Sequence, residues 1–392
     1  MPCWQRNSQI RNVRRNATSD WIPNPFLPLD HVRLETASMA REIRVAIAGV
    51  GNSASSLVQG IEYYRQQKKT IGLARPKIGP YTVPDIHIVA AFDIDKRKVG
   101  KDLSEAIFQE PNNTRKFVQP RSLGVEVQMA QPLDGVSPIA GEKIVVSDSK
   151  PSNAAKTLTE SKAEVLVNLT PTGATKASQM YAQAALQSKS ALINATPARI
   201  ASNSAWQSKY RKKKIPLAGD DVMDQIGSTI LHRNVLELLV DRGVRIGETY
   251  QLDIGGGTES QLSLDKKRYE IKRNIKTSAV AAAVPYQFPI VAGSSDFVDF
   301  MENRRTSYFN IKGEYFGGTD FSLDMRMSLE DGPACAAIVT DVIRMTKLAW
   351  DQGQTGPLIT VSAYGFKAPP KRIPDQILKQ EIASLAKGTT HT

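Results

Sequence analysis

Two glycines separated by one residue follow an apolar run at residues 43–48, in the order Gly49-Val50-Gly51-Asn52-Ser53-Ala54. Between a predicted strand and a predicted helix, this spacing is typical of a turn that binds the pyrophosphate of a dinucleotide. The first glycine allows the tight turn, the second lets the backbone approach the phosphates, and the small Ala54 permits close helix–strand packing. The N–H groups at the helix start would face the anion. A purely structural glycine turn is the alternative interpretation.

Such a site needs a carboxylate at the end of its second strand, to hold the ribose hydroxyls of the adenosine. Asp93 in the segment AAFDID is in this position, and its negative charge favours NAD over NADP. It lies about twice as far along the chain as the usual ~20 residues. We interpret the segment 68–81, KKTIGLARPKIGPY, as an insertion that accounts for the excess.

Lys272 and Lys276, in YEIKRNIKTSAV, are four residues apart, so a helix would place both on one face. Neighbouring ammonium groups can grip a phosphate and stabilise an oxyanion. Together with desolvation they also lower one another's pKa, so that one of them can act as a base. The same spacing is common on a solvated helix face, and the residues alone leave both interpretations open.

The elements that must position these residues alternate along the first half of the chain. Residues 43–48 are predicted to form a buried strand and residues 53–66 an amphipathic helix. Further strands are predicted in IHIVAAFDID, EVLVNLTPTG, SALINATPA and KIPLAGDDV. Strands that alternate with helices predict a doubly wound parallel sheet, and so an α/β protein.

The pattern changes near residue 226. The segments GETYQLDIGGG, TSYFNIKGEYFG and FSLDMRMSLE alternate with a period of two, as expected for an antiparallel or mixed sheet with one open face. A helix in PACAAIVTDVIRMTKLAW and a strand in PLITVSAYGF then indicate a return to the first sheet. We therefore predict a split Rossmann domain, residues 39–226 and 333–392, with an inserted α+β domain at residues 227–332.

Composition narrows the function classes. The formal net charge is +12, which suits an anionic substrate. The sequence has no basic motif interleaved with aromatic residues of the kind that a nucleic-acid-binding protein would have. Cys3 and Cys335 are the two cysteines, too few for a disulfide framework or a cysteine zinc site. No apolar run is long enough to cross a membrane and no signal pattern begins the sequence, so we expect a cytoplasmic protein. Residues 1–38, rich in Arg and Pro, are predicted to be a disordered basic tail.

Several segments between Met39 and Pro370 resemble the myo-inositol-1-phosphate synthase (inositol-3-phosphate synthase) family, in its bacterial and archaeal branch. They are VAIAGVGNSASSLVQGIEYY, AAFDIDKRKVGKDLSEAIF, IPLAGDDV, KTSAV, SDFV and SAYGFKAPP. The resemblance implies an NAD-binding Rossmann domain and an inserted domain that binds substrate and drives homotetramer formation. It also implies an isomerase of inositol and phospholipid biosynthesis, and so of lipid metabolism.

The implied reaction is a redox-neutral cyclisation of D-glucose 6-phosphate to 1D-myo-inositol 3-phosphate. In it NAD⁺ oxidises C5, a proton leaves C6, the enolate attacks the C1 aldehyde, and the same cofactor reduces C5 again. Matching positions imply the catalytic residues Lys272, Lys276, Lys367, Asp296 and Arg305. They also imply the cofactor-binding residues Gly49, Gly51, Asn52, Ala54, Ser55, Asp93, Asp102, Thr170, Gly173, Tyr181, Ala195, Thr196, Asp220, Asp221, Asp224, Glu259 and Asp341. Carboxylates such as Asp220, Asp221 and Asp341 could hold a divalent or monovalent cation; the metal, if any, is unknown.

Five positions depart from the family pattern: Met223, Gly257, Glu259, Leu262 and Arg305. Arg305 stands where the family has an active-site lysine, and an arginine can clamp an oxyanion but cannot act as a base. The intact dinucleotide motif suggests a shifted substrate rather than lost function. Three alternatives stay open: a cyclase of another sugar phosphate, for example one that closes a hexulose phosphate to a five-membered carbocycle, a non-catalytic NAD-binding paralogue, and an ordinary dehydrogenase.

Overall fold

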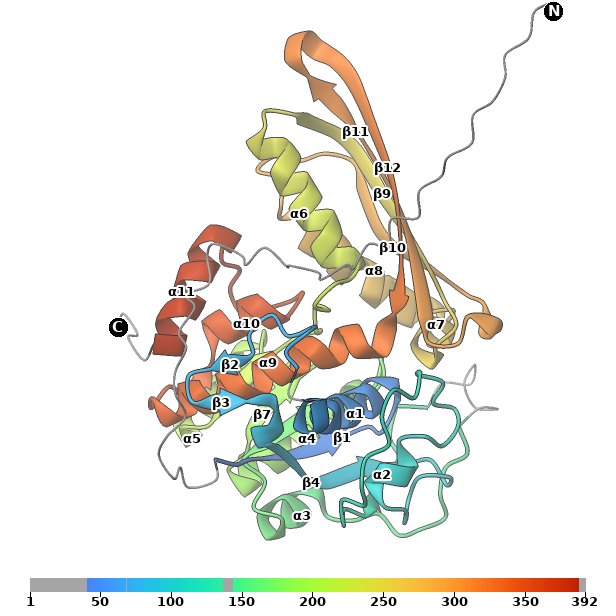
Figure 1. Ribbon diagram of the computed structural model, residues 1–392, viewed down its shortest axis with the longest axis vertical. Coiled ribbons are helices and arrows are strands. Elements are labelled where there is room, and N and C mark those ends of the chain that lie inside the picture. Colours follow the sequence, from blue (N-terminus) through green and yellow to red (C-terminus); the bar gives the residue numbers. More distant parts are fainter. Residues whose placement is uncertain (1–40, 68, 137–143, 388–392) are drawn as a thin grey trace, which may run out of the picture. The chain divides into compact units, whose positions relative to one another are not determined.

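The computed structural model describes residues 41–67, 69–136 and 144–387. The predicted tail at residues 1–38 lies outside these ranges. Within them, seven strands form one sheet in the order β13-β8-β7-β6-β1-β4-β5, and every neighbouring pair is parallel (Figure 1). The strands are β1 (Ile43–Ala48), β4 (Ile86–Asp93), β5 (Val127–Met129), β6 (Val165–Asn168), β7 (Ala191–Asn194), β8 (Pro216–Gly219) and β13 (Gly356–Pro357). The predicted α/β class is confirmed.

Helices cover both faces of this sheet, and each face has its own hydrophobic cluster. The central strands contribute to both clusters, because their successive side chains point to opposite sides. On β1, Val45 and Ile47 belong to one hydrophobic cluster, and Ala46 and Ala48 to the other. The first cluster includes α1 (Asn52–Gln67) and α9 (Asp331–Asp351). The second includes α3 (Ala154–Glu160), α4 (Thr175–Ser188) and α5 (Ser204–Lys213). The prediction for β1 matches its observed bounds, and that for α1 differs by one residue at each end.

The segment interpreted as an insertion contains a small hairpin, β2 (Lys77–Ile78) and β3 (Tyr81–Thr82). Ile78 and Tyr81 are buried in the same cluster as α9. A short helix, α2 (Leu103–Ala106), follows β4, and 3₁₀ turns occupy Val83–Asp85, Asp299–Met301 and Phe316–Gly318.

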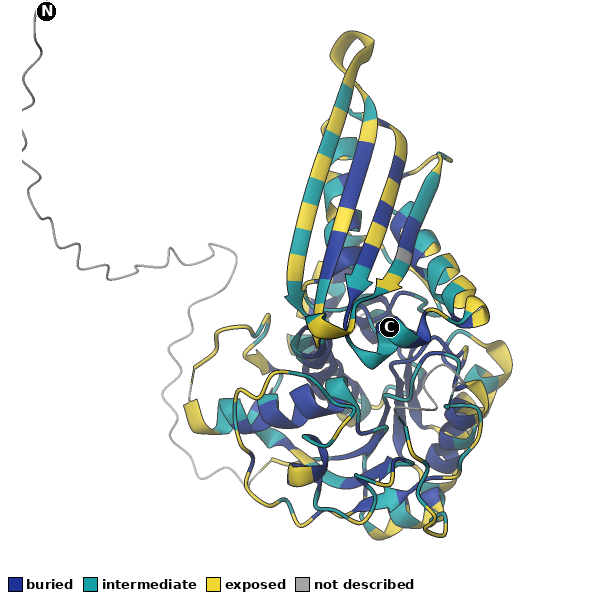
Figure 2. Ribbon diagram, turned by 90° about the vertical axis from the view of Figure 1, so that its right-hand side faces the viewer, coloured by how far each residue is buried: buried dark blue, intermediate teal, exposed yellow. Residues whose placement is uncertain are grey.

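A second, four-stranded sheet follows, in the order β10-β9-β11-β12. It contains β9 (Arg245–Gly255), β10 (Ile290–Phe297), β11 (Arg304–Tyr315) and β12 (Thr319–Glu330), with β9 and β10 parallel and the other pairs antiparallel. One face packs on α6 (Ser228–Asp241) and α8 (Lys266–Ala281) through a third hydrophobic cluster. The other face is open, so buried and exposed residues alternate along the strands (Figure 2). This confirms the mixed sheet with one open face. The domain boundaries at 226 and 333 stay a prediction.

The strand predicted in PLITVSAYGF is wrong beyond its first residues. Gly356 and Pro357 pair with β8, but the following residues form α10 (Ile359–Gly365). Leu358, Val361 and Gly365 recur at helical spacing and face the core, and a Cβ at Gly365 would lie 2.5 Å from Val342 Cγ2 of α9. The β-branched residues suggested a strand, but close helix–helix packing determines the conformation. A further helix, α11 (Asp375–Lys387), ends the described chain.

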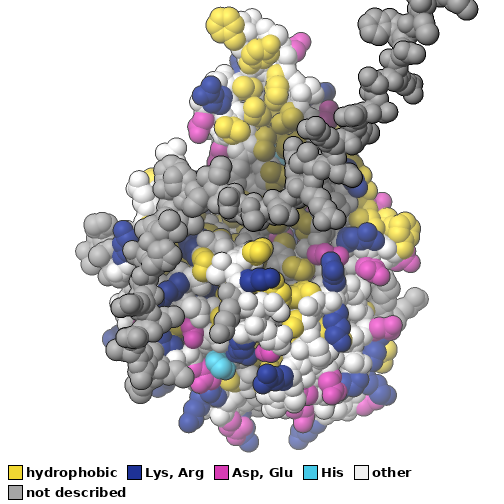
Figure 3. Space-filling view, in the orientation of Figure 1, with side chains coloured by type: hydrophobic (Ala, Val, Ile, Leu, Met, Phe, Trp, Pro, Cys, Tyr) yellow, Lys and Arg dark blue, Asp and Glu magenta, His cyan; other side chains and the backbone are white. Residues whose placement is uncertain are grey.

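Two findings concern the membrane and nucleic-acid functions that the composition argued against. None of the helices in the described ranges combines the length and the apolar character that a membrane span requires. On the face drawn in Figure 3, Lys and Arg side chains are scattered among Asp and Glu side chains.

Candidate active site

A cavity of about 270 Å³ lies at the carboxyl ends of β1, β4, β6 and β7, and reaches the end of the second sheet. The chain runs from β1 to β4 and β5 on one side, then crosses to β6 on the other, so β1 and β6 flank the topological switch point. Ligands of open parallel sheets bind at such points. Gly49 lies there with φ +93°, and a Cβ on it would lie 2.8 Å from the carbonyl oxygen of Leu169. The glycine motif is therefore placed as the sequence predicts.

The residues at this end of the cavity fit a dinucleotide. No described atom lies within 4 Å of a Cβ built on Gly51, so the space in front of its backbone is open to a phosphate. The first internal bond at the start of α1 runs from Ser55 N to Gly51 O at 2.9 Å, which leaves the preceding amides available to an anion. Asp93 lines the cavity and accepts hydrogen bonds from the N–H groups of Val50 and Ile94, both at 2.7 Å.

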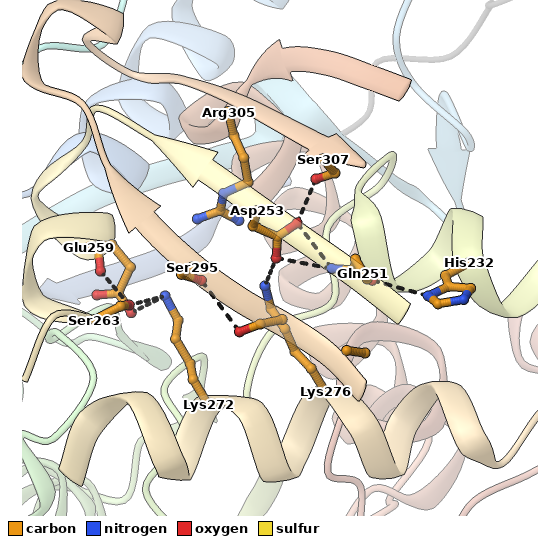
Figure 4. Close-up of polar contacts among 12 residues, drawn as sticks. His232, Gln251, Asp253, Glu259, Ser263, Lys272, Lys276, Ser295, Arg305 and Ser307 are labelled. Atoms are coloured by element: carbon orange, nitrogen blue, oxygen red, sulfur yellow. Dashed lines mark hydrogen bonds and ion pairs between the residues drawn. The ribbon is translucent and has the colours of Figure 1, made fainter. Parts of the chain in front are cut away.

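The other end of the cavity gathers four cationic side chains. Lys272 and Lys276 project from one side of α8, and Arg305 comes from β11 (Figure 4). Lys367 follows α10. Each contacts a carboxylate: Lys272 Nζ–Glu259 Oε1 at 2.7 Å, Lys276 Nζ–Asp253 Oδ2 at 2.5 Å, Arg305 Nη1–Asp331 Oδ1 at 2.8 Å and Lys367 Nζ–Asp221 Oδ1 at 3.1 Å. The spacing argument for one helix face is confirmed. The alternative of a solvated face is wrong for Lys276, whose side chain is 4% exposed.

Two buried lysines at this end of the cavity, Lys276 and Lys367, have opposite pKa shifts. Burial lowers the pKa of Lys276, and the charges of Arg305, Lys272 and Lys367 lower it further against the attraction of Asp253. Burial also opposes the charged form of Lys367, but Asp221 and Asp224 outweigh it and raise the pKa of that lysine. Lys276 is thus the ammonium that most easily becomes a neutral amine, whereas Lys367 keeps its proton.

Asp224 lines the same cavity, and burial, with the charge of Asp331, raises its pKa to about 6. In an unfolded chain the same carboxyl titrates near 3.8. Between these values the folded state binds more protons than the unfolded state, so stability falls as the pH rises through this window. Above it, the ionised Asp224 destabilises the fold.

Asp224→Asn is therefore expected to raise the free energy of unfolding of the cofactor-free protein. The gain should be about 3 kcal/mol at pH 7.5 and less than about 1 kcal/mol at pH 4, because at pH 4 the folded carboxyl is neutral and the unfolded one is only about half ionised. Urea unfolding at the two pH values measures the difference. Equal stabilities at pH 7.5 would contradict the predicted penalty.

Most predicted cofactor residues also line the cavity. They are Gly49, Gly51, Asn52, Ala54, Asp93, Thr170, Tyr181, Ala195, Thr196, Asp221, Asp224 and Glu259. Glu259 lies at the lysine end, where it pairs with Lys272 and accepts from the hydroxyl of Thr172. Ser55 and Gly173 lie just behind the lining. Ser55 is buried in α1, and Gly173, with φ +91°, packs against the side chain of Arg268.

Four predicted carboxylates do not reach the cavity, because other parts of the fold engage them. Asp102 caps α2 through the N–H of Ser104, and Asp341 pairs with Arg344 in α9. Asp220 accepts from backbone amides at Ile200, Ala201 and Ser202 and from Asn194. Asp296 is exposed and pairs in register with Ile254 on the open face of the second sheet. These four side chains therefore lie outside the cavity lining in this structure, and their roles in catalysis and cofactor binding stay predictions.

The departures from the family pattern cluster at the cavity with one exception. Gly257, Glu259, Leu262 and Arg305 line it. Met223 does not: it is buried, and its sulfur lies 3.7 Å from Arg233 Nη1.

Sequence reasoning missed three polar residues that take part in the site: Lys98, Asp253 and Asp331. Lys98 lines the cavity, is 4% exposed, and donates to Val50 O and to Asn112 Oδ1, both at 2.9 Å. A signal for Asp253 was available, since Thr249, Gln251 and Asp253 put three polar side chains on one face of a predicted strand. In the described ranges, no three His, Cys, Asp or Glu side chains are grouped to hold a metal ion, and the predicted cation has no site assigned.

Comparison with known proteins identifies the family to which the chain is similar. The profile of the family described as myo-inositol-1-phosphate synthase matches residues 227–332. The inositol-3-phosphate synthase of Mycobacterium tuberculosis (strain ATCC 25618 / H37Rv) is 39% identical over 365 residues, 92% of this chain and 100% of the relative. That of Mycolicibacterium smegmatis (strain ATCC 700084 / mc(2)155) is 40% identical over 359 residues, 89% of this chain and 99% of the relative. The crystal structure of Ari2 superposes with a TM-score of 0.72 at 30% identity, covering 89% of this chain and 99% of that chain. With this identity over nearly its whole described length, the chain belongs to the myo-inositol-1-phosphate synthase family.

Proposed function

We propose that the protein catalyses the NAD-dependent, redox-neutral cyclisation of D-glucose 6-phosphate to 1D-myo-inositol 3-phosphate. The observation that carries this proposal is the convergence of four cationic side chains on a cavity whose other end is a glycine turn for a dinucleotide. The relatives named inositol-3-phosphate synthase support the choice of product.

The dinucleotide would be held by the turn at Gly51, by the amides at the start of α1 and by Asp93. Thr170 and Thr196 follow β6 and β7, where the nicotinamide side of such sites lies. When bound, NAD supplies a reversible two-electron oxidation of one substrate carbon.

The residues at the other end would accept a proton from the substrate and stabilise its negative charge. Lys276 Nζ, with its lowered pKa, is the group suited to take a proton from the substrate. Arg305 and Lys367 stay charged, and would hold the phosphate and the oxyanion that develops as the ring closes. These fixed charges require little rearrangement during the reaction, because each is already oriented by a carboxylate.

Incubation with D-glucose 6-phosphate and a catalytic amount of NAD⁺, followed by product identification, tests the proposal. We expect an inositol monophosphate and no net accumulation of NADH. Accumulation of NADH with substrate would indicate an ordinary dehydrogenase. Binding of NAD⁺ without turnover of any sugar phosphate would indicate a binding paralogue.

A related cyclase with another sugar phosphate is the second candidate. It is favoured by the four departures that line the cavity, Gly257, Glu259, Leu262 and Arg305. Leu262 is 1% exposed and offers no hydrogen bond to a sugar hydroxyl. A kcat/KM for a hexulose 6-phosphate above that for glucose 6-phosphate would select this candidate.

We also propose that the open face of the second sheet forms the contact of a homotetramer. Leu252 and Tyr308 are paired neighbours on β9 and β11, and are 42% and 40% exposed. Exposed apolar patches of this kind often mark protein interfaces. Asp296 lies on the same face.

Leu252→Arg combined with Tyr308→Arg is therefore expected to convert the tetramer to smaller species. Two charges on each copy would face an apolar surface without a partner. Analytical ultracentrifugation measures the change. The control is Ile377→Arg, which places the same charge on an apolar residue of α11 that is 50% exposed. A wild-type monomer, or a tetramer unaffected by the double substitution, would contradict the assignment of this face.

A further inference from the structure

A row of buried polar side chains runs from the cavity into the second sheet. Thr249, Gln251 and Asp253 lie at alternate positions of β9, so they point to the covered side of the sheet. At the cavity end, Asp253 pairs with Lys276. At the other end, His232 of α6 contacts the row through both ring nitrogens. Its Nδ1 lies 3.2 Å from Gln251 Oε1 (Figure 4). Its Nε2 lies 2.8 Å from Thr249 Oγ1.

The carboxylate of Asp253 sets the orientation of the Gln251 amide. Gln251 Nε2 donates to Asp253 Oδ1 at 3.0 Å and to Oδ2 at 2.9 Å. The opposite orientation would place an amide oxygen against both carboxylate oxygens, with no proton between them. The oxygen of Gln251 therefore faces His232, and a bond between them requires a proton on Nδ1.

Thr249 permits this tautomer of His232. Its hydroxyl lies within reach of two acceptors, since Asn310 O is 2.6 Å away and His232 Nε2 is 2.8 Å away. A hydroxyl carries one proton and rotates to suit its partners, whereas the Gln251 amide cannot turn without facing the carboxylate. With the ring proton on Nδ1, the Thr249 hydroxyl can donate to Nε2.

The ring of His232 is fully buried and packs edge-on against Phe309, with ring centroids 5.4 Å apart. Burial lowers its pKa to about 4, although Gln251 and the charge of Asp253 act in the opposite direction. The imidazole is therefore neutral at the pH of an assay, and carries one ring proton.

These hydrogen bonds affect Lys276 through Asp253, which contacts both Gln251 and the lysine. The carboxylate accepts two bonds from Gln251 and one from Ser307 Oγ at 2.6 Å, in addition to the contact with Lys276. A carboxylate that is hydrogen-bonded in this way is a weaker base, and it attracts the proton of the lysine less strongly. The stem of Lys276 is held as well, since a Cβ at Gly293 of β10 would lie 2.5 Å from its Cδ.

The charged groups that face Lys276 come from every element around it. They are Asp253 on β9, Arg305 on β11, Lys272 on α8, Lys367 after α10 and Asp224 after β8. Gln251 and His232 add no charge to this set, so their effect is on the strength of Asp253 as a base.

We propose that His232 and Gln251 are positioning residues for the reaction, in which His232, protonated on Nδ1, holds the Gln251 amide so that its Nε2–H donor binds both oxygens of Asp253 and keeps Lys276 available as a base. The catalytic part of this inference rests on the proposed function. The protonation pattern does not, and it can be measured without substrate.

The first experiment is ¹⁵N NMR of the histidine side chains in the full-length protein. The sequence contains four histidines, so the His232 signals can be assigned by their loss in His232→Asn. We expect a neutral ring protonated on Nδ1 from pH 6 to pH 9. In Gln251→Leu the acceptor for Nδ1–H is lost, and the proton should move to Nε2. A wild-type ring protonated on Nε2, or charged at pH 7, would overturn the proposal.

The second experiment compares kcat profiles against pH with D-glucose 6-phosphate. Gln251→Leu should lower kcat at pH 7 about tenfold and move the acid limb up by about one pH unit, because Asp253 then holds the Lys276 proton more tightly. KM should change less than about threefold, since neither residue lines the cavity. His232→Leu should have the same effect, and His232→Asn, whose amide replaces the Nδ1–H donor, should recover most of it.

Tyr210→Phe is the matched control, because it removes one buried hydrogen bond, from Tyr210 Oη to Ala182 O at 2.9 Å, in a different hydrophobic cluster from that of the second sheet. A loss of kcat in Gln251→Leu that is uniform over pH, as in a merely destabilised control, would overturn the positioning role. If the wild-type protein does not turn over glucose 6-phosphate, the proposed function fails, and the NMR result still decides the hydrogen-bond pattern.

Discussion

Lys276→Met is expected to lower kcat for the proposed cyclisation by at least about 1000-fold, because it removes the one lysine whose burial and cationic neighbours favour a neutral amine. Lys272 and Lys367 cannot replace it. Lys367 keeps its proton through Asp221 and Asp224, and Lys272 lies one helical turn away in contact with Glu259. Steady-state turnover of glucose 6-phosphate measures the loss. Retention of a tenth of the wild-type kcat would exclude Lys276 as the base.

The same substitution should destabilise the fold, by a separate mechanism. Asp253 is 3% exposed, and the charges of Lys276 and Arg305, with bonds from Lys276 and Ser307, overcome the effect of burial and lower its pKa to about 2. Removing one partner of a buried pair of this kind typically costs about 3–5 kcal/mol.

A double variant separates the two effects. In Lys276→Met with Asp253→Asn the uncompensated buried charge is gone, so most of the lost stability should return while kcat stays low. Urea unfolding of the two variants beside the wild type measures the recovery. If activity returned together with stability, the role of Lys276 would be structural.

Gly51→Ala is expected to weaken NAD⁺ binding by about 100-fold while leaving the fold intact. No described atom lies within 4 Å of the added methyl group, and the backbone at this position is not in the left-handed region. The methyl group would instead occupy the space where the pyrophosphate approaches the turn. Calorimetric titration with NAD⁺ and urea unfolding measure the two properties. A variant that bound NAD⁺ as the wild type does would show that the phosphates lie elsewhere.

Gly49→Ala, two residues earlier, should instead destabilise the fold. Its φ of +93° is unfavourable for alanine, and the Cβ would lie 2.8 Å from a backbone oxygen of the neighbouring strand end. We expect it to lower the free energy of unfolding by on the order of 2–3 kcal/mol. Gly100→Ala is the control for φ alone, since Gly100 has φ +82° with no described atom within 4 Å of a Cβ. It should cost about 1 kcal/mol. Equal losses at the two positions would show that the contact with Leu169 contributes nothing.

Elements whose pattern is local could be predicted from the sequence. The strand at 43–48, the following helix and the glycine turn depend on an apolar run and a few neighbouring residues, and the structure confirms them. The same holds for the alternating strands of the second sheet and for the i,i+4 lysines of α8. The segment 358–366 was predicted incorrectly because its β-branched residues satisfy both periods at this length, and packing of Gly365 against α9 decides between them.

The chemistry of the site depended on the tertiary structure. By residue type and spacing, Asp93, Asp102, Asp296 and Asp253 are equivalent acidic residues in or beside predicted elements. The fold places the first in the cavity, uses the second as a helix cap, exposes the third on an open sheet face and buries the fourth against Lys276.

The sequence by itself therefore determined the α/β class, the dinucleotide turn and the family of this protein, since each follows from short segments that are intact in the chain. Only the tertiary structure decided which lysine has a lowered pKa and which carboxylates pair with the cations. The physical reason is that a pKa depends on burial and on charges within a few ångströms, and here those charges come from β9, β11 and the loops after β8 and α10, which strand register and sheet packing bring together.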